Sequence, residues 1–155
     1  EAVPLYKQNL EDRTRILGPH HPHTLTARNN LAGAYQTAGR LNEAIPLHEQ
    51  NLEDRTRILG PHHPHTLNSR NNLAGAYQTA GRLNEAIPLF EQTLKDFENL
   101  LGPHHPHTLN SRNNLADAYR AAGRIEDAEK LFETPSDSED EQNGTEDDPD
   151  HTAGD

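Results

Sequence analysis

Apolar residues recur three and four positions apart along most of this chain, which is the spacing that places side chains on one face of a helix. Two such faces differ in sequence and alternate along the chain. The A-type face comprises Leu25, Leu31, Ala32, Tyr35 and Ala38, and the B-type face comprises Ile87, Phe90, Leu94, Phe97 and Leu101. The pattern therefore predicts alternating helices and indicates an all-α fold.

The predicted helices are separated by residues that end or begin helical turns. Gly39 suits the left-handed backbone that follows a helix, and Asn42 is then expected to be the N-cap of the next helix. Pro46 and Pro88 fall within a first turn, where most backbone donors lack an intrahelical partner, so the proline costs little. A helical hairpin is the predicted building block.

The hairpin is repeated with a period of 42 residues. Residues 1–42 and 43–84 differ at only five positions, Val3/Ile45, Tyr6/His48, Lys7/Glu49, Thr26/Asn68 and Ala27/Ser69. A third, more divergent unit begins at Glu85, and a partial fourth unit, IEDAEKLFE, ends at Glu133. Tandem units of this size predict a solenoid in which each unit packs on its neighbours.

The period assigns every expected element. B-type helices are expected over 1–17, 42–59, 84–101 and, in shortened form, 126–133, and A-type helices over 23–38, 65–80 and 107–122. Seven helices result, and the first B-type helix lacks a preceding partner. Together with the initial Glu1, this predicts that the chain was excised from a longer one. Glu129 replaces Ile87 in the last helix, as suits a polar terminal cap.

Composition narrows the function classes. Only 31% of the 155 residues are hydrophobic, so a large single core is not expected, and the absence of cysteine excludes disulfides and thiolate chemistry. No apolar run is long enough for a membrane helix and no secretory signal opens the chain, which indicates a cytoplasmic protein.

The negative charge is concentrated at one end. The net charge is −11, but residues 134–155 hold nine acids and no Lys or Arg, which leaves about −2 for residues 1–133. A nearly neutral body argues against nucleic acid and against an anionic membrane as partners. The acidic segment 134–155 contains almost no apolar residue and is expected to be disordered. Whether it returns to a groove as a competing ligand is left open.

The repeated residues resemble a known family signature. Asn30, Leu31, Ala32, Tyr35, Gly39 and Ala44 match the pattern of tetratricopeptide (TPR) repeats. The ordinary repeat has about 34 residues, and the longer unit with LGxxHPxT resembles the kinesin light chain type. It is also similar to arrays at the C-termini of bacterial nucleotide-switch ATPases, although nothing here resembles the ATPase. The resemblance implies a right-handed superhelix whose concave groove, lined mainly by A-type helices, binds peptides or partner proteins.

The segment GPHHPHTL occurs three times between units, beginning at Gly18, Gly60 and Gly102. Its imidazoles are candidate metal ligands, and the set is His20, His21, His23, His62, His63, His65, His104, His105 and His107. However, a proline separates two of them in each copy, and the segment has no acidic ligand. We favour the alternative in which Gly18 ends a B-type helix, Pro19 prevents its continuation and Pro22 opens the next helix.

Asparagines of the repeated RNNLA segment are the main candidates for a binding surface. A carboxamide both donates and accepts, so a row of them can bond the backbone of an extended peptide. The candidates are Asn29, Asn30, Asn71, Asn72, Asn113 and Asn114, with Asn68 and Asn110 one turn earlier. The alternative is that these asparagines bond within or between neighbouring helices.

Arginines interrupt the B-type stripe in two units. Arg13 and Arg55 occupy the position that Phe97 holds in the third unit. Kinesin light chain-like repeats have an arginine here that contacts acidic cargo peptides, so the resemblance implies an acidic ligand for these two residues. The alternative is a salt bridge to a nearby acid, Glu11, Glu53 or Asp54.

The same repetition argues against an enzyme, because catalysis needs a unique constellation and every candidate side chain recurs in equivalent surroundings. No cofactor is expected. The sequence therefore predicts a protein–protein interaction scaffold that binds an extended, acidic peptide in its groove. A histidine-rich metal-binding protein and a scaffold that self-associates head to tail or by swapping through its uncovered first helix remain the alternatives.

Overall fold

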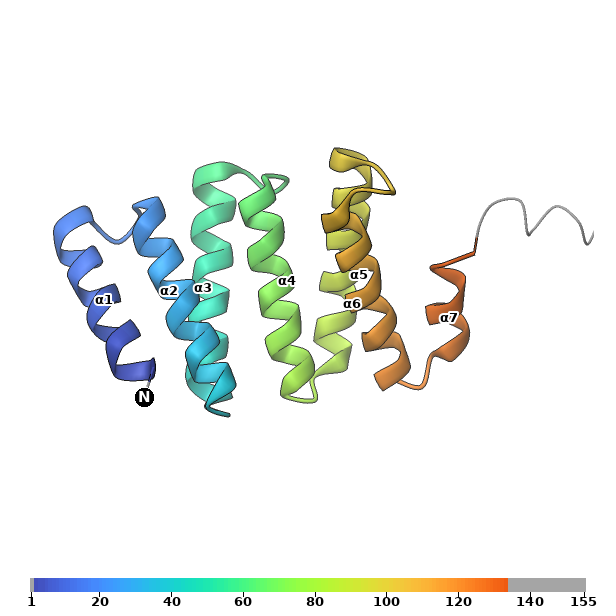
Figure 1. Cartoon of the computed structure of the whole chain (residues 1–155), viewed down its shortest axis with the longest axis horizontal. Helices are drawn as coiled ribbons and strands as arrows, with labels where there is room; N and C mark the ends of the chain where they lie inside the picture. The colour runs from blue at the N-terminus through green and yellow to red at the C-terminus, as the bar shows by residue number, and fades with distance from the viewer. Residues whose placement is uncertain (1, 134–155) are drawn as a thin grey trace, which may run out of the picture.

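The computed structural model describes residues 2–133, and the expected disordered segment 134–155 lies outside them. The described part contains seven helices and no strand. They are α1 (Ala2–Leu17), α2 (Pro22–Thr37), α3 (Leu41–Leu59), α4 (Pro64–Thr79), α5 (Leu83–Leu101), α6 (Pro106–Ala121) and α7 (Ile125–Lys130). Figure 1 shows them side by side in chain order as one elongated row. The B-type helices are α1, α3, α5 and α7, and the A-type helices are α2, α4 and α6.

The helix starts correct one expectation from the sequence. We expected Asn42 to be the N-cap of α3, but α3 begins at Leu41 and Arg40 occupies the cap position. The reason is the tightness of the preceding turn, in which the Arg40 N–H donates to the Tyr35 carbonyl over 2.8 Å. The Arg40 side chain does not cap α3 and pairs instead with Glu43, at 2.7 Å. At the other end of the array, α7 ends at Lys130 rather than 133.

The turn from a B-type to an A-type helix is built from the GPHHPHTL segment. Gly60 ends α3 with a φ of 94°, a conformation that favours glycine. Pro64 occupies the first turn of α4, and the ring of His63 accepts a hydrogen bond from the His65 N–H over 3.1 Å. The buried Thr66 hydroxyl then donates to the Gly60 carbonyl over 2.8 Å. The turn is thus closed by its own side chains.

The reverse turn, from an A-type to a B-type helix, is also fixed locally. Gly81 has a φ of 76°, and Arg82 follows it with its guanidinium 4.5 Å from the centroid of the Tyr77 ring. Arg82 also pairs with Glu85 in the first turn of α5. Such a cation–aromatic contact is attractive and joins the turn to the end of α4. The same contact occurs at the equivalent residues of the other units, Arg40 with Tyr35 and Arg124 with Tyr119.

Small residues allow the helices to pack closely. Six alanines in signature positions have no exposed surface, namely Ala32, Ala44, Ala74, Ala86, Ala116 and Ala128. Buried side chains form three clusters along the row rather than one central core, as the low apolar content predicted. Each helix contacts mainly its neighbours in the chain. The result is a solenoid, stabilised unit by unit.

Candidate polypeptide-binding groove

Three connected hollows run along the A-type helices. Their volumes are about 760, 310 and 340 Å³, and we call them the first, central and third hollow. The first and central hollows share Asn29 and Gly33, and the central and third hollows share Asn71 and Asn114. The shared lining residues make the three hollows sections of one groove. α2, α4 and α6 supply its walls, and B-type side chains supply its floor.

Asparagines join successive A-type helices across the groove. Asn72 of α4 donates to the Oδ1 atom of Asn29 in α2 over 3.0 Å, and Asn114 of α6 donates to Asn71 of α4 over 3.2 Å. We call these four residues the asparagine ladder. Each bond uses one of the two amide protons of the donor and one lone pair of the acceptor. The ladder therefore holds the amides in place while leaving part of their hydrogen-bonding capacity unused.

The predicted asparagines outside the ladder are more exposed than the ladder members. Ladder members are half-buried, whereas Asn30, Asn68, Asn110 and Asn113 are exposed. Asn30 occupies the ladder's donor position and Asn113 its acceptor position, at the two ends of the row. Both readings of the RNNLA segment thus have support, because the amides bond between helices and also line the groove.

Two glycines leave open space in the wall of the groove. A Cβ atom added at Gly33 or Gly75 would meet no other atom within 4 Å. Both residues line the central hollow. The third unit carries Asp117 at the equivalent position, and this side chain is exposed and pairs with Arg120 at 3.2 Å.

The two predicted groove arginines lie in different environments. Arg55 is only 8% exposed and donates to the Ser69 hydroxyl over 2.9 Å and to the His65 carbonyl. Burial lowers the pKa of its guanidinium. Arg13 is half-buried and donates to the Asn9 side chain on the same helix over 3.0 Å. Both bonds of Arg55 come from one terminal nitrogen, and the side chain is buried, so the acidic-ligand role that the resemblance implies for Arg55 stays a prediction that its burial does not favour.

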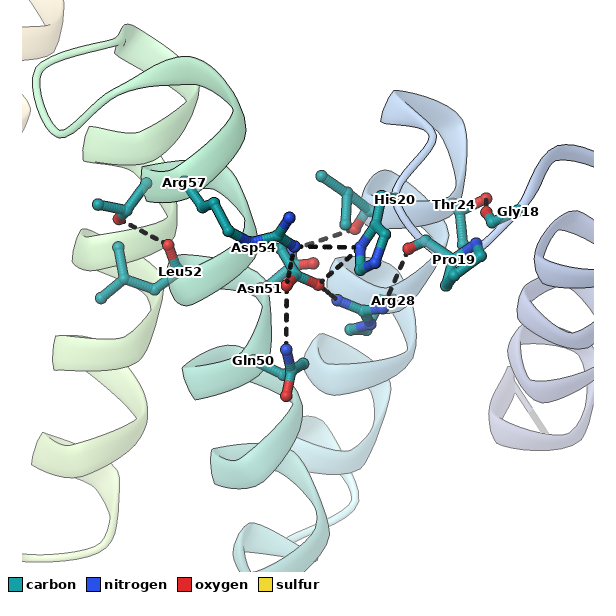
Figure 2. A network of polar contacts seen from close by, with 12 residues as sticks. Gly18, Pro19, His20, Thr24, Arg28, Gln50, Asn51, Leu52, Asp54 and Arg57 are labelled. Atoms are coloured by element: carbon teal, nitrogen blue, oxygen red, sulfur yellow. Dashed lines mark hydrogen bonds and ion pairs between the residues drawn. The ribbon is translucent and has the colours of Figure 1, made fainter.

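Asp54, which we considered as a partner for Arg55, instead anchors a different network (Figure 2). Its carboxylate is 2.6 Å from Arg28 and 3.1 Å from Arg57, and it accepts a hydrogen bond from Gln50 over 3.0 Å. Burial raises the pKa of Asp54, but these hydrogen bonds outweigh burial and lower it overall. The network ties α2 to α3. Asp96 and Arg70 repeat the pair at 2.7 Å between α4 and α5.

The histidines of the repeated segment act in the turns. His21, His63 and His105 each accept a hydrogen bond from the backbone N–H two residues later, over 3.1 Å. Each of these rings also stacks on the ring of that later histidine, at 5.2 Å between centroids. Within residues 2–133, no group of three or more His, Asp or Glu side chains is arranged to hold a metal ion.

The floor of the groove contains a residue that the sequence analysis did not single out. His48 of α3 lines the central hollow and is 4% exposed, and its Nε2 atom is buried without a hydrogen-bond partner. Burial lowers the pKa of the imidazole. A buried polar group without a partner costs about 1–3 kcal/mol. In the sequence, this residue could have been noticed because its position varies from Tyr6 to His48 to Phe90 in otherwise similar units.

The repeated helical hairpins agree with the match of this chain to a known protein family. The family model described as "Tetratricopeptide repeat" matches residues 1–53, 26–99 and 70–134, which together span the described array. The chain is a tetratricopeptide repeat protein. No relative among the curated proteins matches it.

Solved structures place this TPR array among the kinesin light chain-like type. A candidate kinesin light chain of Podospora anserina with nearly identical TPR-like repeats is 37% identical, with a TM-score of 0.78, over 84% of this chain and 62% of that one. A single-substitution variant of that protein is 35% identical with a TM-score of 0.77, over 84% and 61% of the two chains. BtubC (BKLC) from P. vanneervenii, at 23% identity, shows the same fold with a TM-score of 0.77 over 99% of this chain and 61% of that one.

The TPR array spans about three fifths of the length of these solved chains. None of the helices between residues 2 and 133 has the length and hydrophobicity needed to span a bilayer. TPR repeats generally mediate protein–protein interaction. The all-helical fold of the described residues is that of a TPR array.

Proposed function

We propose that this TPR array is an interaction scaffold that binds an extended polypeptide segment in the groove along α2, α4 and α6. The asparagine ladder is the observation that carries the proposal. Its amides are positioned by hydrogen bonds between residues that are 43 positions apart in the chain. They therefore need little reordering when a ligand binds. Groups that are held in place before binding lose less conformational entropy on complex formation.

The chemistry of the ladder favours recognition of the peptide backbone. Asn72 uses one amide proton for Asn29, and its other proton and its oxygen remain available. An extended peptide presents an N–H donor and a C=O acceptor at every residue, which a carboxamide can match at the same time. Such contacts hold a strand in the groove with little regard to its side chains.

Arg13 of α1 is the residue that supports a preference for acidic ligands. Arg13 of α1 is half-buried and lines none of the three hollows. Its bond to Asn9 uses the Nε atom alone, so its terminal nitrogens have donors left for the carboxylate of a ligand that extends beyond the first hollow. The central hollow gives no support for acidity, since its walls consist largely of carboxamides. We therefore propose that acidic residues of the ligand lie toward α1.

Replacing Asn72 by alanine tests this function. We expect about fivefold to tenfold weaker binding of extended peptides, because the loss of one to two net hydrogen bonds corresponds to about 1–1.5 kcal/mol. Fluorescence polarisation with a labelled peptide library measures the change. Asn84→Ala is the matched control, since Asn84 is exposed at the start of α5 and lines none of the three hollows. Equal affinities for wild type and Asn72→Ala would refute the site.

Self-association is a second candidate function, favoured by the first hollow. Ala2, Tyr6 and Ala34 line this hollow, whereas their equivalents Ala44, His48 and Ala76 are buried inside the array. An A-type helix from a second copy would cover the first hollow as α2 covers α3. Light scattering over a range of protein concentrations distinguishes self-association from peptide binding alone. A molar mass that stays at that of a single chain would exclude self-association and leave the peptide-binding groove as the proposed function.

A further inference from the structure

The residues at the floor of the groove differ in polarity from unit to unit. Tyr6, His48 and Phe90 occupy the same position of the repeat in α1, α3 and α5. His48 and Phe90 both line the central hollow and are 4% and 3% exposed. The walls repeat the asparagines in every unit, and they differ in α6, where Asp117 and Arg120 stand in place of the glycine and glutamine of α2 and α4. Between the first two units, whose walls carry the same Gly and Gln residues, the floor residue is the main difference within the groove.

The fold does not require an imidazole at this position. Phe90 fills the equivalent space in the third unit and packs in a continuous apolar cluster with Ala86 and Leu94. The Nε2 atom of His48, in contrast, is buried and has no hydrogen-bond partner. A buried polar atom that the fold neither needs nor satisfies indicates a ligand as the missing partner.

The surroundings define the chemistry of that ligand. Apart from Phe90, the residues that line the central hollow with His48 are carboxamides and glycines, including Gln36, Asn72 and Gly75. None of the described lining residues is Asp, Glu, Lys or Arg. Burial lowers the pKa of His48, so its ring is neutral at neutral pH. A neutral imidazole offers one donor and one acceptor nitrogen. Neutral side chains that can donate or accept, namely hydroxyls and carboxamides, suit this hollow better than a carboxylate does.

We propose that His48 selects a hydroxyl- or carboxamide-bearing side chain of the bound polypeptide in the central hollow. Phe90 presents an apolar floor beside it, so the two positions together fix the register of the ligand along a groove whose asparagines repeat in every unit. This inference rests on the proposed peptide-binding function and adds side-chain selectivity to it. The ladder holds the backbone of the ligand, and the floor residues read its side chains.

The variant His48→Phe tests the inference with little risk to the fold, because Phe90 shows that phenylalanine fits the equivalent site. The probes are alanine-rich peptides of about twelve residues in which one position at a time carries Gln or its near-isostere Met, or Thr or its near-isostere Val. Wild type should prefer Gln over Met and Thr over Val by about tenfold at one position. His48→Phe should abolish this preference, retain binding of the apolar members and melt at a higher temperature.

Two further variants separate the possible outcomes. Asn72→Ala should weaken the members of each pair equally, because it acts on the backbone, and Phe90→His should create a second position that prefers the polar member. Peptide binding by wild type without any preference, or an unchanged preference in His48→Phe, would overturn the inference while leaving the groove intact. Absence of binding by every peptide would overturn the proposed function together with the inference.

Discussion

Replacing Asp54 by alanine should lower the free energy of unfolding by about 3 kcal/mol, because removal of one partner leaves a largely buried charge uncompensated. The side chain of Arg28 is only 12% exposed and its guanidinium is 2.6 Å from the Asp54 carboxylate. Without that carboxylate, the guanidinium keeps only its 3.3 Å contact with the Pro19 carbonyl. Urea unfolding followed by circular dichroism measures the change.

The repeat supplies the control for this substitution. Asp12 is the equivalent residue of the first unit, its side chain is 45% exposed, and it pairs with Arg15 at 3.4 Å. Asp12→Ala should therefore cost less than about 1 kcal/mol. Similar losses for the two variants would show that the buried network does not hold α2 against α3.

The same network sets the direction of the pH dependence. The pKa values of Asp54 and Asp96 are lower in the folded protein than their ordinary value, because hydrogen bonds from Arg28, Arg57 and Gln50, or from Arg70 and Gln92, outweigh the opposing effect of burial. Their stabilising contribution is thus complete above the ordinary aspartate pKa and is lost as the pH falls through the folded pKa. Asp54→Ala should lose less stability on acidification than wild type.

Substituting leucine for Ala86 should destabilise the array by about 2–3 kcal/mol through overpacking. Ala86 has no exposed surface and lies in the largest apolar cluster with Ala74, Leu115 and Ala116. Three added carbon atoms must push α5 away from its neighbours. Thermal and urea unfolding report the loss, and hydrogen exchange should show the greatest loss of protection in α4, α5 and α6.

Ala2 is the equivalent residue in the first unit and is exposed. Ala2→Leu should change the free energy of unfolding by no more than about 0.5 kcal/mol. If Ala86→Leu were equally harmless, the helices would have room that their packing does not suggest.

Repetition made the architecture readable from the sequence. The 42-residue period, the apolar spacing and the Gly-Pro segments each predicted helical hairpins, and the solved relatives and the family model agree with an all-α TPR solenoid. Helix ends were harder to place. Asn42 has good intrinsic capping chemistry, but the tight turn after Gly39 started the helix one residue earlier than its preference suggested.

Side-chain partners between units could not be read in the same way. Arg28 and Arg55 are both arginines next to repeated polar residues, yet the first pairs with Asp54 and the second is held by Ser69 and a backbone carbonyl. Which of them meets the carboxylate depends on how α2, α3 and α4 are rotated about their axes. Similarly, the sequence showed that position 48 varies, but only the packing showed that its imidazole is buried without a partner.

The span of the ladder bonds has a consequence for how such proteins change over generations. Each rung joins residues 43 positions apart, one more than the length of a unit. Gain or loss of a whole unit by recombination between near-identical copies therefore leaves every remaining rung in phase, and lengthens or shortens the groove by one step. Insertion of a single residue within an A-type helix would instead turn the following side chains to another face and break the rung at that place. The number of units thus sets the length of the groove.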